Sequence, residues 1–102
     1  MKINLKPPMS VGKEAARGLS LREKFGRGGT EVGIARARDL KNRRMLTPET
    51  IKRMVSYFVR HEVDKKGRDF NNRTRPSNGK IAWLLWGGEA GKAWANKIKK
   101  SL

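Results

Sequence analysis

Apolar residues recur at helical spacing over much of the chain, and the polar residues between them mark where helices begin and end. Residues 11–25 carry a loose apolar stripe, and Ser10 before them is a suitable N-cap. The glycine-rich segment 26–29 then ends this helix, because glycine readily adopts the left-handed conformation of a helix end. The paired prolines near the start predict an extended leader over residues 1–9.

Two further helices are predicted in the middle of the chain. Thr30 is placed to cap a helix that runs to about Leu40. Thr47 is the next N-cap, and Pro48 stands at the first helical position, where its missing N–H costs nothing. The apolar residues that follow at helical spacing predict a helix to about Val63, and they are Ile51, Met54, Val55 and Phe58.

The last third of the chain alternates polar and apolar segments. Residues 64–76 have few apolar side chains and no periodicity, so they are predicted to form a long surface loop. Ser77 or Asn78 opens a short apolar helix, the glycines at 87–88 turn the chain, and Glu89 begins a final helix. No segment has a convincing strand pattern. The fold class is therefore all-α, a compact bundle of four to five short helices with a long basic surface loop.

The chain of 102 residues fits a single helical domain, predicted at 10–102 after the leader. Its tryptophans, Trp83, Trp86 and Trp94, are predicted to lie mainly in the core, with one of them partly exposed. The alternative is an exposed aromatic patch that binds a protein partner.

The net charge of the chain is the strongest indication of its function. The chain has 25 lysines and arginines against 9 aspartates and glutamates, a formal net charge of +16. Such an excess repels itself and is relieved by a polyanion, whereas solubility alone needs only a few charges. The absence of cysteine removes disulfides, thiolate zinc sites and a cysteine nucleophile. No apolar run is long enough to span a membrane, so we expect a soluble intracellular protein without a membrane partner.

The basic residues cluster between positions 36 and 75, across three consecutive elements. Arginine and lysine pair well with phosphate oxygens, so this excess predicts contacts to a nucleic-acid backbone. Phe70 would stack on a base if it is exposed. The candidate nucleic-acid-binding residues are Arg36, Arg38, Lys41, Arg43, Arg44, Lys52, Arg53, Arg60, Lys65, Lys66, Arg68, Arg73 and Arg75.

Three motifs admit a more specific interpretation. The helices at 30–40 and 48–63 have the lengths of a helix-turn-helix pair, although most such pairs bind no DNA. The glycine-rich segment 26–30 resembles a phosphate loop but lacks the following Lys-Ser/Thr pair and a preceding strand, so a helix cap is favoured. The acidic pair Glu62 and Asp64 would need further carboxylates to hold a catalytic metal, so capping or ion pairing is favoured there.

Several blocks resemble a small basic module of tailed-phage and prophage proteins, whose activity is not established. They cover most of residues 10–95 and are LREKFGRGGT, ARARDL, LTPETIKRMVSYF, RHEVDKKG and GKIAWLLWGGEAGKAWA. The resemblance implies a phage setting, hence the host cytoplasm or the virion, and one folded unit. It assigns no catalytic residue.

We therefore expect a non-catalytic nucleic-acid-binding protein that contacts mainly phosphates and uses no cofactor or metal. Two alternatives stay open. One is a phage protein that binds a host or virion protein or nucleoprotein, as a defence inhibitor or minor head component. The other is a small metal-dependent nuclease centred on Glu62 and Asp64. The sequence leaves DNA or RNA, strandedness and oligomeric state undecided.

Overall fold

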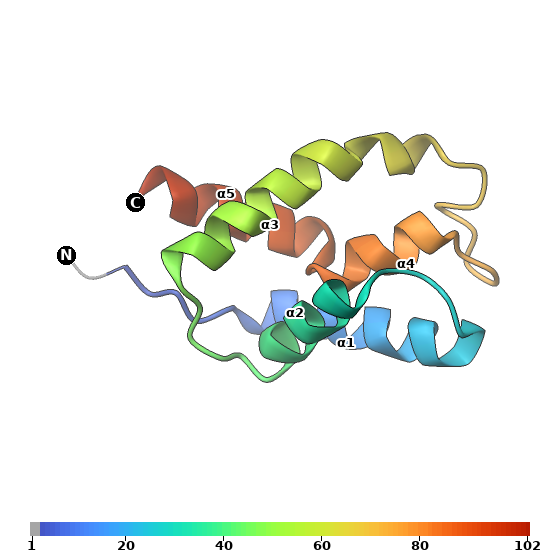
Figure 1. Ribbon diagram of the computed structural model, residues 1–102, viewed down its shortest axis with the longest axis horizontal. Coiled ribbons are helices and arrows are strands. Elements are labelled where there is room, and N and C mark those ends of the chain that lie inside the picture. The colour runs from blue at the N-terminus through green and yellow to red at the C-terminus, as the bar shows by residue number, and fades with distance from the viewer. Residues whose placement is uncertain (1–2) are drawn as a thin grey trace.

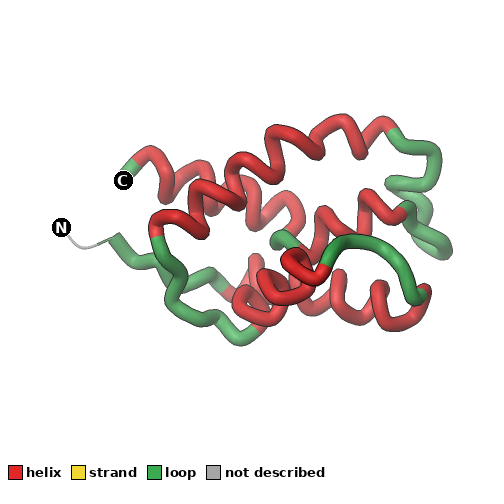
Figure 2. The backbone as a smooth tube through the Cα atoms, in the orientation of Figure 1, coloured by secondary structure: helices red, strands yellow, loops and turns green. Residues whose placement is uncertain are grey.

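Five α-helices and one short 3-10 helix make up the computed structural model, which describes residues 3–102 (Figure 1). No strand occurs among these residues (Figure 2), and the all-α prediction is confirmed. The elements are α1 Met9–Phe25, α2 Glu31–Lys41, α3 Pro48–His61, the 3-10 helix η1 Glu62–Lys66, α4 Asn78–Leu85 and α5 Gly88–Lys100.

Three of the helices begin where a hydroxyl side chain satisfies a free backbone donor. Thr30, Thr47 and Ser77 are the N-caps of α2, α3 and α4, as predicted. Each hydroxyl oxygen accepts a hydrogen bond from the backbone N–H three residues later, at 3.2, 3.2 and 3.1 Å respectively. These local bonds fix the helix starts independently of tertiary packing.

The start of α1 differs from the prediction. The helix begins at Met9 with Pro8 as its N-cap, so Ser10 lies inside the first turn. The reason is that the Pro8 carbonyl accepts the backbone N–H groups of both Val11 and Gly12 at 3.1 Å, which leaves the serine nothing to cap. The extended leader therefore ends at Pro8, and its first two residues lie outside the described part of the chain.

The predicted surface loop at 64–76 is shorter than expected, and Phe70 within it is buried. Its first three residues belong to η1. Phe70 is only 4% exposed and packs edge-on against Trp83, with ring centroids 6.1 Å apart. The ammonium of Lys80 covers the same phenyl ring at 4.7 Å. The condition for Phe70 to stack on a base, exposure of its ring, is not met.

The helices pack in a pattern that the sequence did not indicate. α2 lies on α1 and α4, α3 lies on α5, and α1 also contacts both α4 and α5 (Figure 1). Within the described chain α2 and α3 do not pack against each other. A helix-turn-helix requires these two consecutive helices to form a packed pair, so that prediction is wrong.

The tryptophans occupy the positions expected of a core. Trp83 is 1% exposed and Trp86 is 8% exposed, whereas Trp94 is only partly buried and packs on the edge of the core. This confirms the prediction of a tryptophan-rich core with one ring partly exposed. Across residues 3–102, no helix combines the length and apolar character that crossing a bilayer requires.

Candidate functional site

A cleft of about 1040 Å³ runs along α3, and we call it the α3 cleft. Its lining residues on one side come from the α1–α2 loop and the start of α2, and those on the other come from α3 and η1. The start of α4 lies between them. Its lining residues are Gly28, Gly29, Thr30, Val32, Lys52, Arg53, Ser56, Tyr57, Arg60, His61, Asp64, Asn78, Gly79, Ala82 and Trp86.

Three cations on α3 line this cleft, and we call Lys52, Arg53 and Arg60 the cleft cations. All three are exposed. None of them forms an ion pair or a side-chain hydrogen bond with any residue in the 3–102 range, and the single carboxylate lining the cleft is Asp64. Their charge is therefore available to an anionic ligand.

Arg36 of α2 is a fourth predicted site residue close to the cleft, but it does not line it, and its side chain is only 12% exposed. Its guanidinium pairs with Asp39 at 3.2 Å and lies 5.7 Å above the Trp86 ring. Burial lowers the pKa of Arg36, the Asp39 carboxylate opposes this effect, and the charge of nearby Arg53 adds to it. Arg36 thus adds positive potential beneath the cleft, and its own contacts are to protein.

The other predicted residues around the end of α2 lie outside the cleft. The Arg43 side chain donates from Nε to the Pro7 carbonyl at 2.9 Å, and Arg44 lies 3.7 Å from the Asp39 carboxylate. Arg38 and Lys41 are exposed and do not line the cleft. The hydrogen bond from Arg43 to Pro7 connects the leader to the turn after α2. Arg43 could contact a phosphate as predicted only if its guanidinium served both partners or left the Pro7 carbonyl.

The predicted residues after α3 divide into separate groups. Lys65 bridges Glu62 and Glu89 at 2.9 Å each, and the hydrogen bond to Glu89 is the main cause of its raised pKa.

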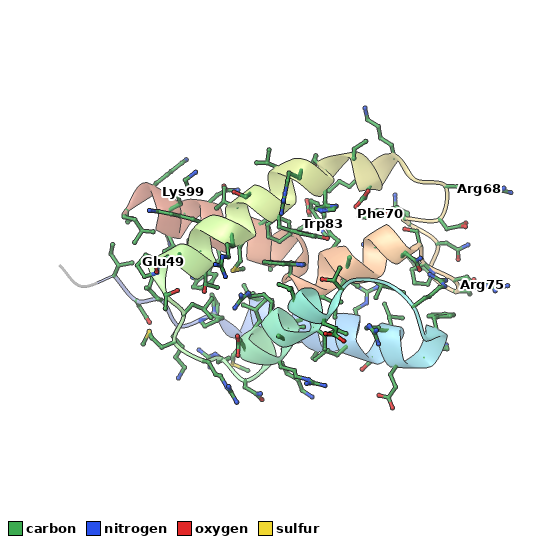
Figure 3. All side chains as sticks on the ribbon, viewed as in Figure 1. Glu49, Arg68, Phe70, Arg75, Trp83 and Lys99 are labelled. Atoms are coloured by element: carbon green, nitrogen blue, oxygen red, sulfur yellow. The ribbon has the colours of Figure 1, made fainter. Side chains whose placement is uncertain are left out.

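Arg73 lines a different hollow, of about 370 Å³, with Arg17 and Lys80. Arg68 and Arg75 extend from the end of the molecule away from both termini (Figure 3), and Lys66 is also exposed. The structure therefore gathers Lys52, Arg53 and Arg60 near Arg36 and leaves the other candidates dispersed.

The two acidic residues considered for a nuclease centre bind different partners. The Glu62 carboxylate accepts hydrogen bonds from Lys65 and Lys92, and these bonds lower its pKa. The Asp64 carboxylate instead accepts from His61 Nδ1 at 3.0 Å. Among residues 3–102 no three histidine, aspartate or glutamate side chains converge to hold a metal ion.

The glycine-rich segment has two roles that the sequence did not separate. Gly26 adopts a left-handed conformation with φ 64° and donates its N–H to the Arg22 carbonyl, so it caps α1 as predicted. Gly28 and Gly29 also have positive φ, at 96° and 75°, and they line the α3 cleft. A Cβ on Gly28 would lie 2.7 Å from the Ile81 side chain, and one on Gly29 would lie 2.5 Å from Leu85 Cδ1.

Tyr57 is a cleft residue that sequence reasoning missed. Its side chain is 5% exposed, and its hydroxyl is enclosed without a hydrogen-bond partner in the described chain. Burial raises the pKa of this phenol, and the negative charge of Asp64 raises it further. The signal was its position four residues before His61 on α3, which puts the two rings on one helix face.

Tyr57 predicts a specific loss of stability in alkaline solution. The unfolded chain releases the phenolic proton near pH 10, whereas the folded protein keeps it well above that value. Below about pH 10 the Tyr57 phenol is neutral in both the folded and the unfolded chain, so its contribution to the free energy of unfolding does not change with pH there. Relative to Tyr57→Phe, the free energy of unfolding should then fall by about 1.4 kcal/mol per pH unit above it.

The measurement is simple because Tyr57 is the sole tyrosine. Tyrosinate absorbance of the native protein should stay absent as the pH passes 10 and appear on unfolding. Native tyrosinate absorbance that rises near pH 10 contradicts the enclosure of this hydroxyl.

Comparison with known proteins gives no relative on which to base a function. No family model matches the chain, and neither a curated protein nor a solved structure matches it.

Proposed function

We propose that this protein binds nucleic acid without catalysis and holds the phosphate backbone in the α3 cleft. The observation that carries the proposal is the set of cleft cations, three positive side chains that line one concave site and have no ion-pair partner among residues 3–102. Charged hydrogen bonds to phosphate oxygens are among the strongest polar contacts available to a protein surface. The net charge of +16 attracts a polyanion to the molecule as a whole.

The helix starts at the cleft support the same proposal. Thr30 and Asn78, at the starts of α2 and α4, both line the cleft. The N-terminal end of a helix carries partial positive charge and free backbone N–H groups, so it favours an anion nearby. The positive potential of these two helix ends adds to that of the cleft cations.

The proposed setting is a tailed phage or prophage, on the strength of the sequence blocks between residues 10 and 95 that resemble a module of such proteins. In that setting the polymer is phage or host nucleic acid. The backbone contacts carry no sequence information, so we propose affinity that differs little between sequences.

The salt dependence of affinity tests this function. The association constant for a short labelled oligonucleotide is measured from low to physiological salt. Three phosphates held by the cleft cations predict a logarithmic slope of about −2 to −3, because each neutralised phosphate contributes roughly 0.7 to 0.9. A chain that binds no oligonucleotide at low salt, or whose affinity ignores salt, contradicts the proposal. A protein partner that stays bound at high salt would instead favour the protein-binding alternative.

A further inference from the structure

A column of stacked planar groups reaches the α3 cleft. Trp86 lies parallel to Tyr57, with ring centroids 4.6 Å apart and an interplanar angle of 8°. On α3 itself, Tyr57 stacks on His61 at 4.4 Å and 23°. Arg36 lies over the Trp86 ring at 5.7 Å. The column therefore joins α2, the end of α4 and α3.

His61 is the end of this column that meets solvent. Its side chain is 41% exposed, and it lines the cleft together with Arg60. Tyr57 covers one face of the imidazole, so the accessible part is the remainder of the ring. The Asp64 carboxylate accepts a hydrogen bond from Nδ1 at 3.0 Å, which fixes the ring plane. The cleft thus presents an oriented aromatic surface beside a cation.

We propose, resting on the function proposed above, that the α3 cleft binds a single strand of nucleic acid with one unpaired base stacked on His61. Unpaired bases expose their π faces, and proteins that bind single strands combine such stacking with a positively charged groove. The cleft cations hold the neighbouring phosphates. Lys52 and Arg60 are eight residues apart on α3, about 12 Å along the helix axis, which is enough for a few consecutive phosphates.

The shape of the cleft argues against a duplex. A helix that reads duplex DNA needs a protruding face that enters a major groove about 12 Å wide. Here the cationic face of α3 looks into a cleft whose opposite side is Gly28, Gly29, Thr30 and Val32. The volume of about 1040 Å³ is at the upper end of small-ligand pockets, so it suits a stretch of a few nucleotides of one strand.

Matched oligonucleotides test the proposal. The probes are a labelled twelve-nucleotide DNA strand, the same sequence as RNA, the corresponding DNA duplex, and a DNA strand of the same length in which every site is abasic. We expect one of the single strands to bind at least about tenfold more tightly than the duplex, and the DNA and RNA arms identify which sugar is preferred. The abasic strand should bind about tenfold more weakly than the intact DNA strand, the size of one lost base–aromatic stack.

Two substitutions at one position separate stacking from charge. His61→Ala should weaken binding of the intact strand about tenfold and leave binding of the abasic strand unchanged. His61→Phe keeps a planar ring without a titratable group and should restore most of the affinity. Thermal unfolding of both variants confirms that the fold is intact.

The outcomes separate failure of the single-strand site from failure of the proposed nucleic-acid binding. Equal, salt-dependent affinity for single strand and duplex, or an equal effect of His61→Ala on intact and abasic strands, overturns the single-strand site and leaves nucleic-acid binding standing. The absence of salt-dependent binding to every probe overturns both.

Discussion

Replacing Gly18 with valine is expected to lower the free energy of unfolding by at least about 3 kcal/mol. Gly18 is buried where α1 crosses α4. A Cβ at this position would stand 2.7 Å from the Leu85 backbone nitrogen and 2.9 Å from the Leu84 carbonyl carbon. Both atoms belong to main chain, so no side chain can move aside and the two helices must separate.

The measurement is chemical or thermal unfolding of the purified variant. A loss of 3 kcal/mol is a large share of the roughly 5–15 kcal/mol that holds a domain of this size together, and it corresponds to a fall of roughly 15 °C in Tm. The control is Ser20→Val, two residues along the same helix at an exposed position, which should change stability by about 0.5 kcal/mol or less. A Gly18→Val variant as stable as this control would contradict the close crossing.

Reversing the charge of all three cleft cations is expected to abolish nucleic-acid binding. The variant carries Lys52→Glu, Arg53→Glu and Arg60→Glu, and its affinity should fall at least about a thousand-fold. Hydrogen bonds to charged groups contribute roughly 1.5–3 kcal/mol each, so the loss of three exceeds the roughly 4 kcal/mol that corresponds to this factor. Because all three side chains are exposed, the fold should be retained.

The control for this variant makes the same change of net charge at another place. Lys97, Lys99 and Lys100 lie in the last turn of α5, and Lys99 stands at the end of the molecule near the C-terminus (Figure 3). Changing these three to glutamate also lowers the formal charge from +16 by 6, and we expect affinity to fall no more than about tenfold. Equal losses in the two triple variants would mean that the total charge, rather than the α3 cleft, binds the polymer.

Helix boundaries were predictable from sequence where they depend on neighbouring residues. The hydroxyls of Thr30, Thr47 and Ser77 bond the backbone three residues on, and such a bond can be inferred from the residue types alone. The start of α1 was missed because a backbone carbonyl, that of Pro8, takes the role for which Ser10 had been proposed. A carbonyl is present at every residue and gives no sequence signal.

Helix pairing was not predictable in the same way. An apolar stripe shows that a helix face is buried, but it does not identify the partner. α3 packs on α5, which is far along the chain, although α2 is its neighbour in sequence. Because α2 and α3 are not a packed pair, the helix-turn-helix prediction is wrong. Phe70 shows the same limit. A single aromatic residue in a polar segment has no periodicity, and its burial against Trp83 follows only from the tertiary fold.

Composition suggests a basic candidate site, but it does not identify the residues that form it. Composition pointed to phosphate binding, and Lys52, Arg53 and Arg60 do lie in one cleft. Charge counting did not distinguish these from Lys65, which two carboxylates neutralise. The column of Trp86, Tyr57 and His61 draws on helices distant in sequence, and only the Tyr57–His61 spacing was visible beforehand.

The side of the cleft formed by Gly28 and Gly29 has a consequence for the kinetics of association. Glycine-rich segments usually lose much conformational freedom on binding, and that loss weakens affinity. Here the space that a side chain would need is already filled by Ile81 and Leu85, and the backbone is seated against them before any ligand arrives. This side of the cleft is therefore packed against α4, and we expect it to keep its shape if a strand binds. Encounter should therefore be governed by diffusion and long-range attraction, without a slow step in which the protein rearranges.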